Sequence, residues 1–229
     1  MKKLFVIIPC FNNFSYTKRC LYTLLDTTKD CNVIIVDDAS TDDTNKYFTA
    51  NTWDNVFYVK NTTNQGVNKS WNIGIKKAIE LGAYYICIAN NDILFTPNWE
   101  IPLINALDGE YSVVSPYSTE RELPKDFPTG KDRHVNPNPL NILGCCFMYT
   151  VNFINECGYF PEDMVHYYGD NWICDIANHK ALKIGHIEQS YIHHLYTKTT
   201  SSLPSSIFFT DKRAYMNYTK INNIVPLLK

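Results

Sequence analysis

The sequence has no long apolar run, no cluster of basic residues and no Cys-x-x-Cys pair. A helix that crosses a bilayer needs about 20 mostly apolar residues, and the run that follows Lys2 and Lys3 is also too short for a signal peptide. A formal net charge of -2 without a basic face argues against a nucleic-acid partner. We therefore expect a soluble, cytoplasmic protein that binds no nucleic acid. Peripheral contact with a membrane stays open.

The eight cysteines are scattered along the chain, and several lie inside apolar runs. A free cysteine in such a run behaves as a small hydrophobic residue. Because the spacing offers no metal-binding pair, we expect neither a zinc site nor a disulfide framework. A reducing compartment fits this pattern best.

The first half of the chain alternates between apolar runs and amphipathic segments. Four runs predict buried strands, at Leu4–Ile8, Asn32–Val36, Val56–Val59 and Tyr84–Ala89. Helices are predicted between them, at about Tyr16–Leu25 with Ser15 as N-cap, from near Thr44, and at Asn68–Leu81 with Gly82 as the stop. This alternation predicts an α/β fold with a doubly wound, mostly parallel sheet. A length of 229 residues fits one large domain.

The second half is less regular. Strands are predicted at Tyr111–Pro116, Asn141–Thr150 and Ser190–Leu195, and helices at Val151–Cys157, Asp170–Leu182 and about Thr210–Tyr218. The segment Ser118–Pro139 is rich in proline and charge, which indicates a long surface loop or lid.

Polar side chains follow three of the predicted strands. Asn12-Asn13 follows the first strand, Asp37-Asp38 the second, and Asn90-Asn91-Asp92 the fourth. Open α/β sheets hold their ligands at the carboxyl edge, and clustered carboxylates need a cation to offset their repulsion. A divalent cation that carries a diphosphate suits this edge. The alternatives are that Asp37-Asp38 caps the next helix and that Asn90–Asp92 is an Asx-rich turn.

A set of short motifs, taken in order, resembles family 2 glycosyltransferases of the GT-A fold. The resemblance runs from about residue 4 to residue 195. Its motifs are Val6–Asn13, Val36–Asp42, Asn64–Gly66 with Asn72–Gly74, Asn90–Asp92, Leu143–Phe147, Gly158–Glu162 and Gly169–Asn171. It implies a single GT-A domain, 1–229, with a nucleotide-binding half at about 1–95 and an acceptor-binding half and tail at about 96–229.

The resemblance also implies which residues bind the nucleotide sugar and a metal. The donor-binding residues would be Pro9, Phe11, Asn12, Asp37, Asp38, Lys69, Asn91 and Asp92. An exposed position on the helix surface is the alternative for Lys69. Asp92 would ligate Mn²⁺ or Mg²⁺. Since Asn90 and Asn91 stand where the family is more acidic, the cation would depend more on diphosphate oxygens and water.

The resemblance implies further site residues in the second half of the chain. Asp170 would be the general base, with an N-cap as its alternative role and Asp175 as the reserve. His193 and His194 resemble the late histidine that completes the metal shell. Strand alternation points them to opposite faces, so at most one of them should bind the metal.

The expected function is inverting transfer of a sugar from a nucleotide-diphosphate sugar to an acceptor hydroxyl on a glycan, a lipid-linked molecule or a protein. Segment Ser118–His134 would be a lid that orders on binding. Two alternatives stay open. A sugar nucleotidyltransferase would favour a glycine-rich, basic loop after the first strand, which Cys10–Asn13 does not provide. A binding module without catalysis is compatible with the reduced acidic motifs.

Overall fold

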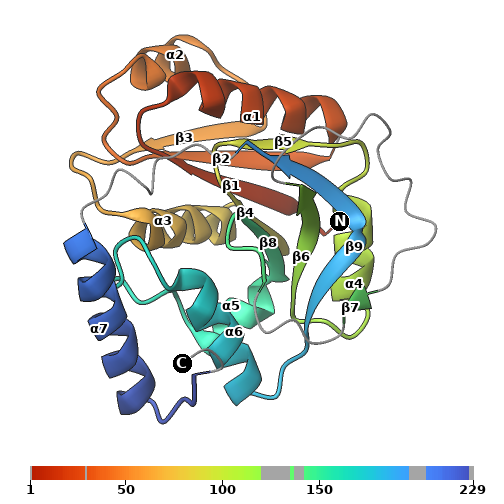
Figure 1. The fold of residues 1–229 in the computed structure, drawn as a ribbon. Helices are drawn as coiled ribbons and strands as arrows, with labels where there is room; N and C mark the ends of the chain where they lie inside the picture. Colours follow the sequence, from red (N-terminus) through yellow and green to blue (C-terminus); the bar gives the residue numbers. More distant parts are fainter. Residues whose placement is uncertain (1, 29, 120–134, 137–141, 196–204, 227–229) are drawn as a thin grey trace.

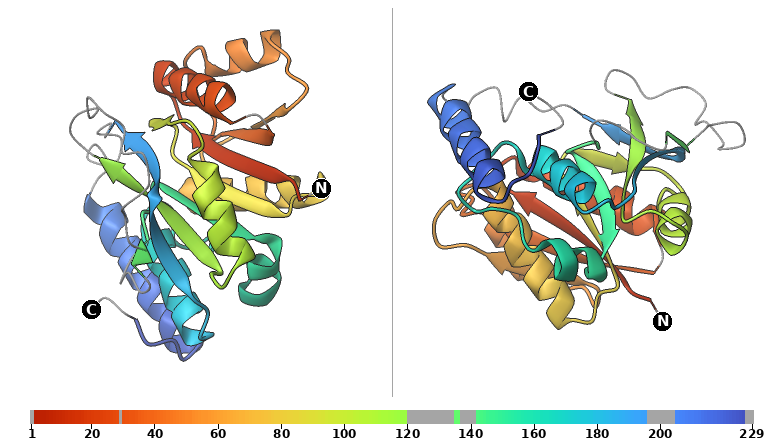
Figure 2. Two further views of the ribbon diagram at one scale, coloured as in Figure 1. Left: turned by 90° about the vertical axis from the view of Figure 1, so that its right-hand side faces the viewer. Right: turned by 90° about the horizontal axis from the view of Figure 1, so that it is seen from below.

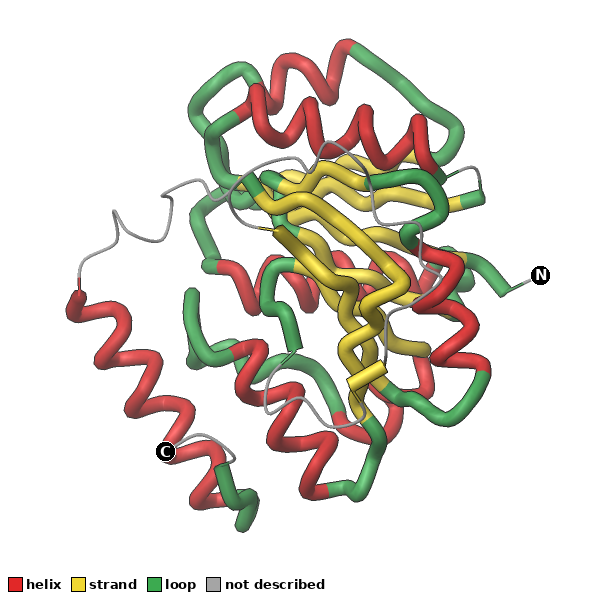
Figure 3. The backbone as a smooth tube through the Cα atoms, turned by 45° about the vertical axis from the view of Figure 1, so that its right-hand side comes forward, coloured by secondary structure: helices red, strands yellow, loops and turns green. Residues whose placement is uncertain are grey.

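The computed structural model describes residues 2–28, 30–119, 135–136, 142–195 and 205–226. Within these ranges the chain builds a nine-stranded sheet in the order β3-β2-β1-β4-β8-β6-β9-β5, with β7 paired to β9. One sheet therefore runs through both halves of the chain, with helices on both of its faces (Figure 3).

The first half forms the parallel part of the sheet (Figure 1). Its strands are β1 (Leu4–Cys10), β2 (Cys31–Asp37), β3 (Val56–Lys60) and β4 (Tyr85–Ala89). Its helices are α1 (Phe14–Thr27), α2 (Thr44–Ala50) and α3 (Val67–Glu80). The predicted β-α alternation is confirmed here.

The second half extends the sheet in mixed directions. β8 pairs antiparallel with both β4 and β6, β6 pairs parallel with β9, and β5 pairs antiparallel with β9. The strands are β5 (Ile93–Phe95), β6 (Val113–Thr119), β7 (Val135–Asn136), β8 (Cys146–Thr150) and β9 (Ile184–His194). The helices are α4 (Glu100–Asp108), α5 (Val151–Cys157), α6 (Gly169–His179) and α7 (Ser205–Ile221).

Two apolar cores lie on opposite faces of the sheet. Helices α1, α2 and α4 cover one face, and α3, α5 and α6 cover the other (Figure 2). On β1 the side chains alternate between the two cores, with Phe5 and Ile7 in one and Val6 and Ile8 in the other. A strand buried on both faces must be apolar throughout, which explains the unbroken apolar runs.

Several elements differ from the sequence-based prediction. α1 begins at Phe14 and not after Ser15, because Asn13 adopts a left-handed conformation and the Phe14 N–H donates to Asp42 at 2.9 Å. The predicted strand Ser190–Leu195 is the end of the much longer β9. Helix α4 has no predicted counterpart.

The predicted loop or lid falls mostly outside the described residues. Residues 120–134 and 137–141 are not described, so the prediction of a lid at Ser118–His134 stays a prediction. Ser118 and Thr119 belong to the end of β6, and Val135–Asn136 pairs with β9 as β7.

No helix among the described residues is both long enough and apolar enough to cross a bilayer. All eight cysteines are free thiols, and only Cys145 and Cys157 are partly exposed.

The contact between α3 and β1 leads to a stability prediction at Gly74. A Cβ added there would lie 2.3 Å from Ile7 Cγ2 and 3.2 Å from Val36 Cγ2. We expect Gly74→Ala to lower the free energy of unfolding by about 1–3 kcal/mol through overpacking, as measured by urea denaturation. The matched control is Gly109→Ala, where the added Cβ approaches nothing closer than 3.4 Å. Equal effects of the two substitutions would contradict this account.

Candidate active site

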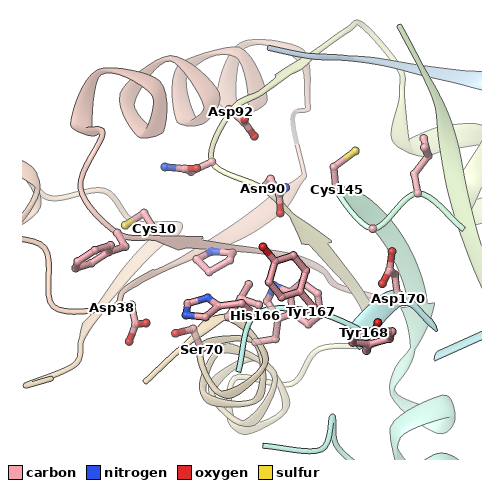
Figure 4. A pocket seen from close by; sticks show the side chains of 18 of the residues that line it. Cys10, Asp38, Ser70, Asn90, Asp92, Cys145, His166, Tyr167, Tyr168 and Asp170 are labelled. Atoms are coloured by element: carbon pink, nitrogen blue, oxygen red, sulfur yellow. The ribbon is translucent and has the colours of Figure 1, made fainter. Parts of the chain in front are cut away.

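A cavity of about 850 Å³ opens at the carboxyl edge of the parallel strands. Its walls come from the end of β1, the start of α3, the β4–β5 turn, the loop before β8, the loop into α6, and single residues of β9 and α7 (Figure 4). This volume is typical of sites for small molecules and cofactors. Asp38 and Asp92 line the same cavity, as expected from the topology.

One wall is formed by the ends of β1 and β2. Pro9, Cys10, Phe11 and Asn13 line it, and the Phe11 side chain is 40% exposed. Asp38 is buried beside them. Its Oδ1 accepts hydrogen bonds from the Asn61 side chain and the Gln65 N–H, and its Oδ2 accepts one from the Gly66 N–H, each at 2.8 Å. Asp38 therefore holds the loop before α3 against this wall.

Three of the predicted donor-binding residues do not line the cavity. Asp37 is fully buried, and its carboxylate accepts hydrogen bonds from the Ser40 N–H and the Tyr58 hydroxyl. Asn12 Oδ1 accepts the Thr41 N–H at 2.9 Å, which ties the loop after β1 to the loop after β2. Lys69 lies on α3 and is not among the residues that line the cavity. Asp37 and Asn12 thus build the wall without forming its surface.

The helix-cap alternative for Asp37 and Asp38 is not what the structure shows. The N–H and hydroxyl groups of Thr44, at the start of α2, both donate to Asp42 Oδ1. The two strand-end aspartates instead bind loop N–H groups.

The β4–β5 turn contributes Asn90, Asn91 and Asp92 to the cavity. Because β5 pairs antiparallel with β9 and places Ile93 opposite His194, the His194 ring lies beside Asp92. Its Nε2 is 3.1 Å from Asp92 Oδ1. Burial lowers the pKa of His194, but its hydrogen bonds to Asp92 and Cys145 outweigh this and raise the pKa to about 10. His194 is therefore an imidazolium paired with a carboxylate at neutral pH.

His193 points to the other face of β9. It is buried and does not line the cavity. Burial, followed by the charges of His194 and Arg19, lowers its pKa. Of the two histidines, His194 is the one placed beside Asp92.

The residues around Asp92 fit a divalent cation that takes some of its ligands from the protein and the rest from a substrate and water. Asp92 offers a carboxylate, His194 an imidazole, and Asn90 an amide oxygen on the same wall. Among the described residues, no group of three or more His, Cys, Asp and Glu side chains could hold a metal by itself. A cation bound here would complete its shell with diphosphate oxygens and water, which is the usual arrangement for Mg²⁺.

Asp170 lies across the cavity from Asp38, at the start of α6 (Figure 4). Its carboxylate packs over Gly144, where a Cβ would lie 2.7 Å from Oδ2. Burial raises the pKa of Asp170, and backbone N–H groups, with Asn171 first among them, offset part of this rise. A half-buried carboxylate with a raised pKa suits a general base. Asp175, the reserve, is buried and binds the Tyr215 hydroxyl instead.

Several other cavity residues were assigned no functional role from the sequence. Among them are Ser70 and Trp71 of α3, Cys145 just before β8, His166 and Tyr167 of the loop before α6, and Phe208 of α7. Ser70 Oγ and Trp71 Nε1 are buried polar atoms without a hydrogen-bond partner in the described part of the chain. Only the face of α3 that carries them could have been foreseen, from the spacing of its apolar residues.

The chain is similar in sequence to two curated proteins. Two uncharacterized glycosyltransferases, from Rickettsia felis and Rickettsia conorii, are each 30% identical to the chain over 102 residues. These residues are 44% of this chain and 17% of each relative. The chain therefore matches about a sixth of the length of these curated relatives.

Solved structures show the same fold at low sequence identity. GalNAc-T7 with UDP, GalNAc and Mn²⁺ has a TM-score of 0.70 at 15% identity over 86% of this chain and 44% of that one. The mannosyltransferase PcManGT from Pyrobaculum calidifontis, in complex with GDP-Man and Mn²⁺, has a TM-score of 0.67 at 18% identity over 86% and 58%. TarS 1-349 of S. aureus has a TM-score of 0.66 at 20% identity over 84% and 60%. The GT-A fold expected from the sequence is confirmed.

The sequence model of the family described as "Glycosyl transferase family 2" matches residues 5–161. The match extends from β1 to the turn after α5 and so covers more than half of the chain. The matched segment includes the cavity-lining residues from Pro9 to Cys145, whereas those from His166 onward lie beyond it. The chain belongs to glycosyl transferase family 2.

Proposed function

We propose that the chain transfers a sugar from a nucleoside-diphosphate sugar to an acceptor hydroxyl, with inversion at the anomeric carbon. One observation carries the proposal: Asp38, Asp92 and Asp170 come from distant segments and line a single cavity. The first two lie at the carboxyl ends of parallel strands, where α/β folds bind nucleotides. The third lies across the cavity from Asp38.

The nucleotide would occupy the wall that Pro9, Phe11 and Asp38 form. The exposed Phe11 ring offers an apolar surface to the base, and Asp38 offers carboxylate oxygens at the adjoining surface. The diphosphate would then reach Asn91 and Asp92 on the β4–β5 turn. The UDP and GDP-sugar complexes of the structural neighbours support this class of donor. The part foreseen for Lys69 at the diphosphate stays a prediction.

Asp92 and His194 would hold a divalent cation, Mn²⁺ or Mg²⁺. The cation would supply positive charge that stabilises the departing diphosphate. The neighbours that contain Mn²⁺ support this choice. His194 must lose its proton to bind the metal, since an imidazolium has no lone pair to donate.

Asp170 would accept the proton of the acceptor hydroxyl. As that proton moves to the carboxylate, the acceptor oxygen forms a bond to the anomeric carbon. The bond from this carbon to the diphosphate oxygen breaks, and the nucleoside diphosphate leaves with the electron pair. Attack from the face opposite the leaving group inverts the anomeric centre. The acceptor would carry its hydroxyl on a glycan, a lipid-linked molecule or a protein.

The donor class is tested by thermal shift. UDP-GlcNAc, UDP-GalNAc and GDP-mannose are each added with and without Mn²⁺. Because a ligand that binds only the folded state stabilises it by mass action, the matching donor should raise the melting temperature most when Mn²⁺ is present. Asp92→Asn should remove the Mn²⁺-dependent part of the shift. If neither these nor other nucleotide sugars stabilise the protein, the proposal is wrong.

The base is tested with Asp170→Asn. We expect transfer and donor hydrolysis to fall by about 10²–10⁴-fold, the usual contribution of a general base, with donor binding unchanged. Because burial raises the folded-state pKa of Asp170 above its unfolded value, the fold loses stability as the pH rises from the unfolded-state pKa to the folded-state pKa. The neutral amide avoids this cost, so its melting temperature at pH 7 should equal or exceed that of the wild type.

The matched control is Asp163→Asn. Asp163 is an exposed aspartate just before the loop that leads into α6, and it does not line the cavity. This variant should keep full activity. Full transfer by Asp170→Asn would rule out Asp170 as the base. Donor binding by a wild type that neither transfers nor hydrolyses sugar would favour the binding-module alternative.

The metal site is tested by the pH dependence of Mn²⁺ binding. With a pKa of about 10, His194 is protonated before the metal binds, so Mn²⁺ must displace a proton. Below that pKa, Mn²⁺ affinity should rise about tenfold per pH unit, with about one proton released per ion. Calorimetry in two buffers of different ionisation enthalpy counts the proton. His194→Gln should flatten the dependence, and a flat profile in the wild type would contradict the assignment.

A further inference from the structure

The C-terminal helix α7 lies outside the part of the chain that the family model matches, which ends at residue 161. It nevertheless reaches the cavity, because Phe208 near its start lines the wall beside Tyr167 and Tyr168. Figure 1 shows α7 beside α6, along the edge of the molecule. The family resemblance therefore assigns no part to this helix.

Asp211 of α7 binds the loop that leads into α6. The residue is fully buried, and its carboxylate accepts hydrogen bonds from three successive backbone N–H groups. The donors are Val165 at 3.0 Å, His166 at 2.7 Å and Tyr167 at 2.9 Å. Hydrogen bonds to an ionised acceptor are about twice as strong as neutral ones. Three of them on one carboxylate fix the local backbone.

This backbone carries side chains of the cavity. His166 and Tyr167 line it directly, and Figure 4 shows both projecting between Asp38 and Asp170. Tyr168, with a φ of 66°, then turns the chain into α6, whose second residue is Asp170. A displacement of the loop would therefore move the proposed base together with two cavity side chains.

The same loop is also tied to the opposite wall. The Val67 N–H, at the start of α3, donates to the Val165 carbonyl at 2.8 Å. Val67 follows Gly66, which Asp38 holds. The loop is thus fixed between α3 on one side and Asp211 on the other.

A second contact of α7 serves a different purpose. The Tyr215 hydroxyl donates to Asp175 of α6, and its ring stacks on Tyr168 with centroids 4.9 Å apart. Tyr215 thus attaches α7 to α6 through side chains. Asp211 alone of the two binds the loop backbone.

We propose that Asp211 is a positioning residue for the transfer reaction. Through the three N–H groups it holds the segment Val165–Tyr167, and thereby sets where Asp170 meets the acceptor. The effect on catalysis rests on the function proposed above, whereas the effect on the loop does not.

The test compares Asp211→Asn with Tyr215→Phe. The amide keeps the shape of Asp211 but turns one acceptor oxygen into a donor that faces an N–H group. Tyr215→Phe keeps the ring on Tyr168 and loses only the hydroxyl bond to α6. Hydrogen exchange followed by mass spectrometry should show the amides of Val165–Tyr167 exchanging at least about tenfold faster in Asp211→Asn and at the wild-type rate in Tyr215→Phe.

Hydrolysis of UDP-GlcNAc, UDP-GalNAc and GDP-mannose, each with Mn²⁺, supplies the catalytic readout. We expect kcat to fall about tenfold or more in Asp211→Asn, because small displacements of a reacting group are costly. The KM for the donor should change less than kcat, since the wall at Pro9, Phe11 and Asp38 is untouched. Tyr215→Phe should keep its kcat. If the amide variant does not fold, Asp211→Glu keeps the charge, displaces the carboxylate by one methylene and should shift both readouts in the same direction.

Two results would overturn the proposal. One is unchanged protection of Val165–Tyr167 in the Asp211 variants, and the other is faster exchange of this loop with an unchanged kcat. A wild type that hydrolyses none of these donors would count against the proposed function, while the exchange rates would still decide whether Asp211 holds the loop.

Discussion

Parallel pairing of β1 with β2 and β4 is the constraint on which the rest of the structure depends. The middle residues of all three strands are buried on both faces and are apolar. Polar groups are confined to the strand ends, and parallel pairing places these ends at one edge. Cys10 stands opposite Asp37 in this register. The cavity is the consequence of these restrictions together.

At the carboxyl edge of the sheet, neighbouring acidic residues have different structural roles. Asp37 and Asp38 are adjacent in the chain, yet the first closes the loop after β2 and the second holds the loop before α3 at the cavity surface. Each finds N–H donors, which offsets the cost of burying two carboxylates side by side. Asp92 has the His194 ring as its neighbour, with Nε2 3.1 Å from Oδ1. Burial raises the pKa of Asp170, and the N–H of Asn171, at 3.0 Å from Oδ1, offsets part of that rise.

The second half of the chain supplies what the parallel strands cannot. β9 runs back along β5 and brings His194 to Asp92, although the two residues are about a hundred positions apart in sequence. The loop before α6 brings Asp170 to the other side of the cavity, and α7 buttresses that loop. The cavity thereby gains a second wall that carries Asp170, and His194 comes to lie beside Asp92.

The sequence by itself determined the α/β class, the strands of the first half, and the placement of Asp38, Asp92 and Asp170 at strand or helix ends, because buried strands and helix starts leave local patterns. Only the tertiary structure decided the antiparallel pairing in the second half, helix α4, the choice of His194 over His193 beside Asp92, and the link from Asp211 to the loop before α6. It also decided the turning of Asp37 and Asn12 away from the cavity. Each of these features depends on a contact between residues far apart in the sequence, and local sequence patterns do not specify such contacts.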